Sequence, residues 1–221
     1  MKTVNTTWNL VAALLIVLLA NGIARADSTS TLHGADESPA LTGKGVHFAA
    51  GFIGHRLDLQ DDAYDALYEA GVDLSREGLG MELLGGYRFG PRLSLNLRIA
   101  TSSHDTGRAD LEAGLGLAMF EMLAHLRPGE RVQPFLSGGL GGGGLVLSPD
   151  KGDDVTLEGA AFAAGGGVDV LISDRWTLGF AYRAAIIDYE TATIDLPGSA
   201  PVTFRGTGLA HEFGFRWDFR I

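Results

Sequence analysis

Serine, histidine and acidic residues are the side chains in this sequence that could perform acid–base or nucleophilic chemistry, and four of them adjoin each other. Ser102, Ser103, His104 and Asp105 supply every residue type of a Ser–His–acid triad, in which a histidine activates a nucleophilic serine. Triad members are normally brought together by the fold rather than by adjacency, and no known esterase signature surrounds this run. We therefore treat hydrolase or acyltransferase chemistry as the least favoured interpretation.

The six histidines do not form a pattern typical of a metal site. No two of them have the spacing of metal ligands on one helix, and the chain has no cysteine that could bind zinc as a thiolate. His47 and His55 would share one face of a strand, but eight residues of extended chain separate them by about 26 Å. We expect structural roles for the histidines, and neither a metal nor another cofactor.

A glycine run and two acidic segments also have simple structural interpretations. The run GGLGGGG at 138–144 lacks the Lys-Ser/Thr pair of a phosphate-binding P-loop, and no predicted helix follows it. Its glycines instead allow tight coiling of the chain or leave space for large neighbouring side chains. The acids at 61–77 and 150–154 lack the spacing of an EF-hand calcium loop, so we expect a solvated or cation-bridging surface.

The first 26 residues have the organisation of an export signal. Lys2 supplies a positive charge, an apolar run follows at 10–20, and Ala-Arg-Ala at 24–26 has small residues where a signal peptidase reads them. The apolar run is shorter than the roughly 20 residues of a membrane-spanning helix. We predict a signal peptide over 1–26 that is cleaved between Ala26 and Asp27, followed by a flexible polar segment over 27–43.

The composition favours a strand-rich exported protein and argues against nucleic acid as a partner. The chain of 221 residues carries a formal net charge of −10 at pH 7, and an acidic surface repels a phosphate backbone. Thirty-two glycines against seven prolines, without a collagen period, are typical of closely packed and strongly curved strands. The absence of cysteine excludes disulfides and thiolate chemistry.

From Lys44 onward, apolar and polar residues alternate with the period of two that is typical of β-strands. From Leu93 to Ile99, for example, every second residue is Leu or Ile, and polar residues lie between them. Counting such segments predicts eight strands, at 44–59, 77–89, 92–102, 108–126, 131–147, 155–172, 175–190 and 206–221.

Short and long connections alternate strictly between these strands, which predicts an antiparallel up-and-down sheet. The short connections are 89–92, 127–131 and 173–175. The longer, polar connections are 60–76, 103–107, 148–154 and 191–205. One end of the sheet therefore carries tight turns and the other carries loops. With an even number of strands, the first strand begins and the last strand ends at the end with the short turns.

Two segments depart from simple alternation. In 108–126, one face carries the apolar set Leu111, Leu115, Leu117 and Met119, and the same phase continues to Glu121. We expect a bulge near Phe120 to reset the register there. In the first long connection, the apolar residues of 62–74 have helical spacing, so we expect a short helix.

The two faces of the predicted strands favour a membrane-spanning barrel. The apolar face is broad and rich in aromatic residues near the end with the short turns, as at a membrane interface. Only a closed sheet satisfies every backbone group within lipid, and eight strands leave an interior that side chains just fill. The polar face carries both signs of charge and is expected to form a paired network in the lumen: Glu82, Arg88, Arg98, Glu112, Asp169, Arg183, Glu212, Arg216 and Asp218.

The last segment, HEFGFRWDFRI at 211–221, shows the same alternation most clearly. We expect it to close the barrel against the first strand, with its charged residues in the lumen and no further domain after it. Its lipid-facing residues would be Phe213, Phe215, Trp217, Phe219 and Ile221.

The segments RVQPFLSGGLGGGG (131–144) and AAGGGVDVLISDRWTLGFAYR (163–183), with the aromatic terminal strand, resemble the OmpA/OmpX-type and opacity-protein-like outer-membrane barrels. The resemblance covers about residues 44–221, and its motifs mark the barrel rather than an activity. Such barrels usually end on an aromatic residue, whereas this sequence ends Phe-Arg-Ile. The resemblance implies an all-β, eight-stranded antiparallel transmembrane up-and-down barrel in the outer membrane of a Gram-negative bacterium, with short periplasmic turns and longer extracellular loops.

A protein of this kind is expected to have a structural, envelope-integrity or surface-interaction role, with a lumen plugged by paired charges. Its expected partners are outer-membrane lipid, lipopolysaccharide, the barrel-assembly machinery during biogenesis and an extracellular partner of unknown identity, and we expect a monomer. The acidic loops would repel lipopolysaccharide or bridge to it through cations. The alternatives are a narrow porin-like or small-hydrophobe channel and, third, a lipid A-modifying enzyme.

Overall fold

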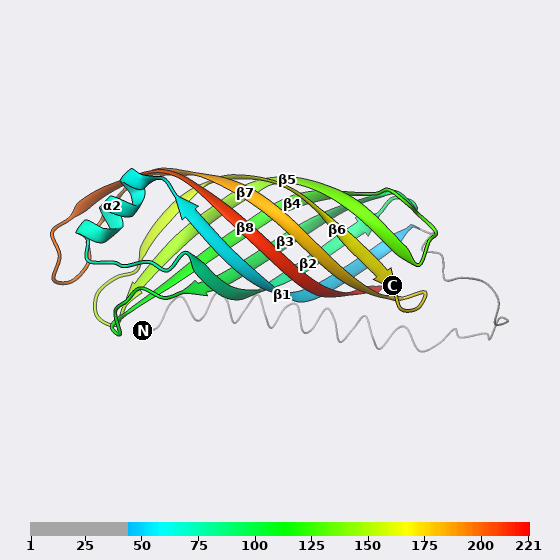
Figure 1. The fold of residues 1–221 in the computed structure, drawn as a ribbon, viewed down its shortest axis with the longest axis horizontal. Helices are drawn as coiled ribbons and strands as arrows, with labels where there is room; N and C mark the ends of the chain where they lie inside the picture. Colours follow the sequence, from blue (N-terminus) through cyan, green and yellow to red (C-terminus); the bar gives the residue numbers. More distant parts are fainter. Residues whose placement is uncertain (1–43) are drawn as a thin grey trace. The chain divides into compact units, whose positions relative to one another are not determined.

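The computed structural model describes residues 44–221, which form one closed β-sheet and a short helix (Figure 1). The predicted signal peptide (1–26) and polar segment (27–43) lie outside the described residues. The elements are β1 (Gly45–Leu59), α2 (Asp61–Glu69), β2 (Glu77–Arg88), β3 (Leu93–His104), β4 (Leu111–His125), β5 (Val132–Pro149), β6 (Val155–Leu171), β7 (Trp176–Ile194) and β8 (Val202–Arg220).

Each strand pairs antiparallel with its neighbours in the chain, and β8 also pairs with β1, which closes the barrel. The closing register places Gly51 opposite Arg216 and His55 opposite Glu212. A closed sheet has no edge strand with unpaired backbone groups, which is the condition for crossing a bilayer as strands. The predicted eight-stranded antiparallel up-and-down barrel is confirmed.

Short and long connections lie at opposite ends of the barrel, as predicted. The end that we call the turn end carries the short connections 89–92, 126–131 and 172–175. The end that we call the loop end carries the longer connections 60–76, 105–110, 150–154 and 195–201. β1 begins and β8 ends at the turn end (Figure 1).

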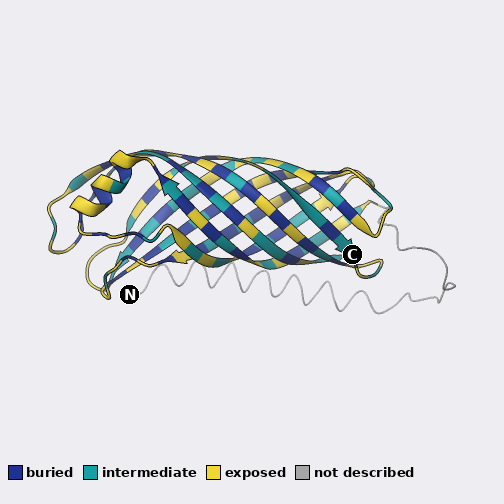
Figure 2. Cartoon of the chain, viewed as in Figure 1, coloured by how far each residue is buried: buried dark blue, intermediate teal, exposed yellow. Residues whose placement is uncertain are grey.

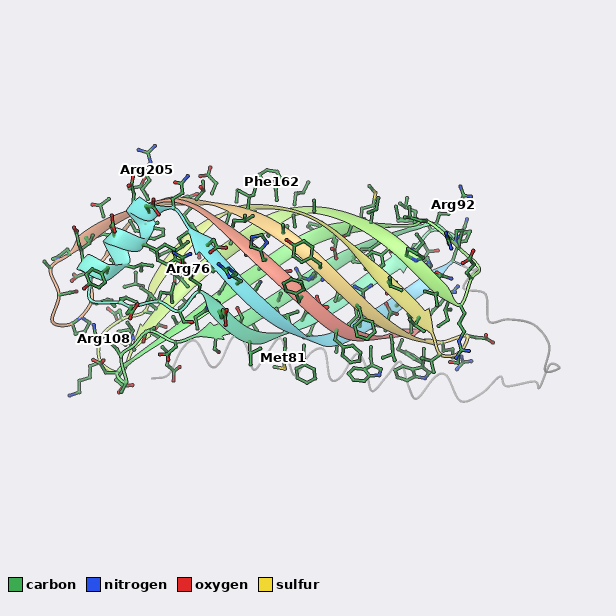
Figure 3. All side chains as sticks on the ribbon, in the orientation of Figure 1. Arg76, Met81, Arg92, Arg108, Phe162 and Arg205 are labelled. Atoms are coloured by element: carbon green, nitrogen blue, oxygen red, sulfur yellow. The ribbon has the colours of Figure 1, made fainter. Side chains whose placement is uncertain are left out.

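The outer surface of the barrel wall is a broad apolar band. More exposed and less exposed residues alternate along the strands, which gives the chequered pattern of Figure 2. Met81 and Phe162, for example, project outward from the wall and are 57% and 62% exposed (Figure 3). Further large exposed apolar residues of the wall are Phe52, Leu97, Phe120, Leu140, Phe180 and Ile186. A continuous apolar band of this kind is typical of a surface that contacts lipid.

The interior has two halves of different chemistry. In the half near the loop end, buried apolar side chains form one continuous core, which includes Ile53, Leu57, Leu115, Leu145, Leu157, Ile187 and Phe204. In the half near the turn end, many of the buried side chains are charged or polar, among them Glu82, Arg98, Glu121, Asp169, Arg183 and Arg216. Both halves are filled by side chains, but only one of them has the polar character that the sequence predicted for the whole lumen.

Strand β4 turns its leucine-rich face inward, which corrects two predictions. The apolar set of this strand is buried in the lumen: Leu111, Leu115, Leu117 and Met119. No bulge occurs near Phe120, because the pairing with β3 and β5 runs without a shift and carries the same phase to a buried Glu121. Glu112 is therefore exposed on the outside, not in the lumen. The physical reason is the apolar core near the loop end, where leucine is an interior residue.

Helix α2 covers the apolar core at the loop end (Figure 1). Its buried residues Ala63, Ala66 and Leu67 join that core, and the helix also packs against β8. The helix ends earlier than the predicted segment 62–74, and Gly71 follows with a left-handed φ of 78°. Within residues 44–221, no helix is long and apolar enough to cross a membrane.

Glycines on the inner face make room for large side chains of the lumen. A Cβ at Gly179 would lie 2.8 Å from Asp169 Oδ1 and 2.9 Å from the side chain of Arg216. A Cβ at Gly143 would lie 2.7 Å from Leu117 Cδ2. Gly143 belongs to the glycine run at 138–144, which forms the middle of strand β5 rather than a phosphate-binding loop.

Candidate functional site

A network of buried ion pairs crosses the middle of the lumen. Arg183 of β7 contacts Glu121 of β4 (Nε to Oε1, 2.6 Å) and Glu82 of β2 (Nη1 to Oε2, 3.2 Å). Arg98 of β3 contacts Glu82 (Nε to Oε2, 2.8 Å) and Glu212 of β8 (Nη2 to Oε2, 2.6 Å). These five side chains are at most 4% exposed. Removing one partner would leave a buried charge uncompensated, which typically costs about 3–5 kcal/mol.

His55 of β1 connects this network to a serine in a Ser–His–acid arrangement. Its Nδ1 lies 2.6 Å from Ser102 Oγ, and its Nε2 lies 2.7 Å from Glu212 Oε1. Both distances are those of a nucleophile–base and a base–acid contact. Ser102 Oγ also lies 3.1 Å from His104 Nε2, and His104 Nδ1 lies 3.0 Å from the carbonyl oxygen of Ser75.

The Ser–His–acid arrangement lies in the packed interior. Ser102 is 3% exposed, and the side chains of His55 and Glu212 are fully buried. Because these side chains are buried, a substrate could reach Ser102 only if the packing around it opened. The sequence grouped Ser102 with Asp105, but Asp105 is exposed in a loop. Buried polar groups normally have hydrogen-bond partners, and these contacts provide such partners for Ser102, His55 and Glu212.

A second polar layer lies near the turn end. Asp169 of β6 contacts Arg216 (Oδ1 to Nη2, 3.0 Å) and His125 (Oδ2 to Nε2, 3.0 Å). His47 Nδ1 lies 2.8 Å from Asp218 Oδ2. This layer surrounds a cavity of about 30 Å³ at the turn end of the lumen.

Arg88 lies in the same layer and has no carboxylate partner among the described residues. Its Nη2 donates a hydrogen bond to Gln133 Oε1 at 3.3 Å, and its Nε has no hydrogen-bond partner. Arg88 is only 6% exposed. The sequence predicted a charge-paired Arg88, whereas the structure places it in the lumen beside a neutral amide.

The structure brings together most of the residues that the sequence assigned to the lumen. Glu82, Arg98, Asp169, Arg183, Glu212 and Arg216 are buried in ion pairs. Asp218 is partly buried against His47, and Glu112 is outside. Glu121, His55 and His125 also belong to the polar layers, although their positions in the sequence did not assign them to the lumen. For Glu121 a signal existed, since it continues the phase of Leu117 and Met119.

The outward residues of β8 form an aromatic surface with β7. Phe215 packs against Phe180 with ring centroids 5.0 Å apart, and Phe219 packs against Trp176 at 4.8 Å. Such cross-strand aromatic pairs stabilise strand pairing. On this outer face Phe213 and Trp217 are exposed, and Phe215 and Phe219 are partly exposed. Ile221, which follows the end of β8, is also exposed.

The loop end carries an acidic surface. On and beside α2, Asp61, Asp62, Asp65 and Glu69 are exposed, and the other loops add Asp105, Asp110, Asp150, Asp153 and Asp154. Arg108 donates a hydrogen bond to Asp110, which lowers the pKa of that carboxyl group. Within residues 44–221, no group of three or more His, Cys, Asp or Glu residues is arranged to hold a metal ion.

A closed barrel with an apolar outer wall and ion pairs inside defines the class: an integral β-barrel membrane protein. Residues 13–209 match the family described as outer membrane protein beta-barrel domain, so the chain belongs to this family and to the outer membrane. No curated protein matches the sequence significantly.

Solved structures of similar fold come from several bacteria. Neisserial surface protein A is 13% identical with a TM-score of 0.61, over 81% of this chain and 99% of that protein. OprG from Pseudomonas aeruginosa is 16% identical with a TM-score of 0.53, over 84% of this chain and 100% of that protein. Ail, the attachment invasion locus protein of Yersinia pestis, is 13% identical with a TM-score of 0.50, over 81% and 99%. At these identities the likeness establishes the fold alone.

Proposed function

We propose that this protein is a plugged outer-membrane barrel that supports the cell envelope and makes contacts through its surface loops. The filled lumen carries this proposal. Near the loop end, an apolar core that α2 covers fills the lumen. Toward the turn end, Arg98 and Arg183 tie strands together across the interior. Water could pass through the lumen only if both packed layers opened, so we expect no steady conducting pore.

We infer that residues 1–26 direct export and are removed, and that the turn end faces the periplasm. The charge distribution supports this orientation. At the turn end exposed bases outnumber exposed acids, whereas at the loop end the acids outnumber bases such as Arg76, Lys151 and Arg205. Anionic phospholipid headgroups would attract the exposed bases of the turn end, which are Lys44, Arg92, Arg127, Arg131 and Arg175. Arg92 is seen at this end in Figure 3. N-terminal sequencing of the membrane-fraction protein should begin at Asp27, and a start at Met1 would contradict the export proposal.

The loop end would face the cell exterior as a negatively charged surface. Such a surface favours cationic partners, or lipopolysaccharide bridged by divalent cations, and disfavours acidic partners. Expression of the protein should therefore increase binding of cells to a polycationic surface. Neutralising the exposed acids of α2 with Asp61→Asn, Asp62→Asn and Asp65→Asn should reduce that binding. Equal binding with and without these acids would remove the surface role assigned to α2.

Permeability separates the plugged barrel from a channel. Liposomes that contain the folded protein should take up small sugars no faster than protein-free liposomes. The second candidate, a small-hydrophobe channel, draws on the apolar lining near the loop end, which includes Leu57, Leu115 and Leu145. Faster uptake of a small apolar solute, with unchanged uptake of sugars, would favour that candidate.

An enzymatic role makes a separate prediction, because it would depend on Ser102. Lipid A mass spectra should be identical in cells with the wild-type protein, with Ser102→Ala and without the protein. A modified lipid A species that requires Ser102 would replace our proposal with the enzyme.

A further inference from the structure

The cavity at the turn end of the lumen is lined by residues from seven of the eight strands. Its wall includes the cationic groups Arg88, Arg216 and Arg220, the carboxylates Asp169 and Asp218, and Ser94. His47 and His125 complete the titratable groups of the wall. The cavity is thus the place where the charged groups of the turn-end layer meet.

Several hydrogen-bond donors on this wall have no partner among the described residues. These donors are Arg88 Nε, Arg216 Nε and Nη1, and Ser94 Oγ. Arg88, Ser94 and Arg216 are 6%, 2% and 2% exposed. Buried donors that lack an acceptor are strongly unfavourable, and charged donors most of all. A molecule that offers acceptor capacity in the cavity would relieve this cost.

The charges of the cavity wall point to an anion rather than to water alone. Three arginines face two aspartates. The oxygens of Asp169 are engaged by Arg216 and His125, and Asp218 is engaged by His47. Arg88 therefore has no carboxylate in direct contact, because Asp169 and Asp218 act on its buried charge only from a longer distance. Water could satisfy its Nε–H group but would not supply the missing negative charge.

We propose that this cavity binds one small inorganic anion of halide size, held by the guanidinium groups of Arg88 and Arg216 and by the Ser94 hydroxyl. The volume supports this choice of ligand. One water molecule requires roughly 10–15 Å³ by the same measure, so about 30 Å³ accommodates a chloride or bromide ion. A phosphate group, with four oxygens around phosphorus, would have to displace side chains of the wall. The anion would act as a structural counter-ion, independently of the role of the loops.

Bromide offers a direct test on the wild-type protein. Crystals grown in sodium bromide should show an anomalous difference peak in the cavity, within hydrogen-bonding distance of Arg88 and Arg216. An anomalous map without a bromide peak there would overturn the proposal, whatever density water contributes.

Stability in different salts gives a second test that needs no crystal. At equal ionic strength in neutral detergent, the wild-type protein should resist urea better in sodium chloride than in sodium gluconate. Above the dissociation constant, each tenfold rise in chloride should raise the folded-to-unfolded ratio by up to about tenfold. Arg88→Gln should abolish this dependence, and Arg127→Gln, at a solvent-exposed turn residue, should retain it. Equal chloride dependence in Arg88→Gln, or stabilisation by phosphate and not by chloride, would overturn the proposal.

Discussion

Glu121 of β4 and Arg183 of β7 form a 2.6 Å ion pair between strands that are not neighbours in the barrel. The pair therefore joins two parts of the wall across the lumen, where backbone hydrogen bonds cannot reach. The carboxylate of Glu82 on β2 contacts both Arg183 and Arg98. This one acid therefore links the Glu121–Arg183 pair to β2 and β3. The lumen network thus fixes the cross-section of the barrel from inside.

A matched pair of substitutions on β4 tests the interior position of Glu121. Glu121→Ala removes a buried partner of Arg183 and should cost about 3–5 kcal/mol of stability. Glu112→Ala changes an exposed acid of the same strand and should cost within about 0.5 kcal/mol. Urea unfolding, followed by the different gel mobilities of folded and boiled protein, measures both. Equal losses for the two variants would place Glu121 outside the network.

A second matched pair on β8 tests the depth of the outer wall in lipid. Phe213 is 65% exposed on the apolar wall, so Phe213→Arg should cost about 2–4 kcal/mol if the position lies near the bilayer midplane. Thr203→Arg, near the loop end of the same strand, should cost about 0–1 kcal/mol. The fraction of folded protein recovered from liposomes reports the difference. Equal tolerance of arginine at both positions would argue against a lipid-facing wall.

Removing residues 213–221 should prevent closure of the barrel. This segment provides the pairing of β8 with the first half of β1 and with the start of β7. Without it, both partners would expose unpaired backbone groups to hydrocarbon, which is strongly unfavourable. The truncated chain should therefore lack the heat-modifiable gel band of a folded barrel. A normal folded band would show that closure does not depend on this segment.

Gly179 tests the space that glycine provides inside the lumen. A Cβ at this position would lie within 2.9 Å of both Asp169 and Arg216, so Gly179→Ala should separate the pair and cost about 1–3 kcal/mol. Gly138→Ala is the control, because its Cβ would point outward and meet nothing closer than 3.9 Å. The thermal unfolding midpoint should be lower for Gly179→Ala than for Gly138→Ala. Equal midpoints would show that the lumen has room for a methyl group at Gly179.

Much of the fold follows from the sequence because the period of two survives along all eight strands. Turn lengths and the even strand number predicted the two ends of the barrel, and the broad apolar face predicted closure, because only a closed sheet satisfies its backbone groups in lipid. The predicted assignment of strand faces to lumen and lipid was correct for β2 and β3. There the inward positions are polar, as at Glu82, and the outward positions are apolar, as at Leu97. The assignment was wrong for β4, because leucine serves both lipid contact and the apolar core, and alternation alone does not distinguish the two environments.

The contacts of the candidate site depend on register, which local sequence does not encode. His55 contacts both Ser102 and Glu212 only because β1 pairs with both β2 and β8 and the curved wall brings β3 near. The lack of a carboxylate contact at Arg88 has the same cause. The sequence contains enough acids, but their positions relative to Arg88 depend on register. Local pattern therefore identified the residues of the polar layers better than it identified their partners.

Single-channel recording in planar bilayers tests the plugged lumen most directly. The purified wild-type barrel should give no steady conductance, because the apolar core under α2 and the ion pairs of Arg98 and Arg183 fill the interior. A large-pore barrel recorded in the same bilayers would serve as the positive control. Large, steady single-channel currents from the wild-type protein would contradict the account and favour a porin-like channel.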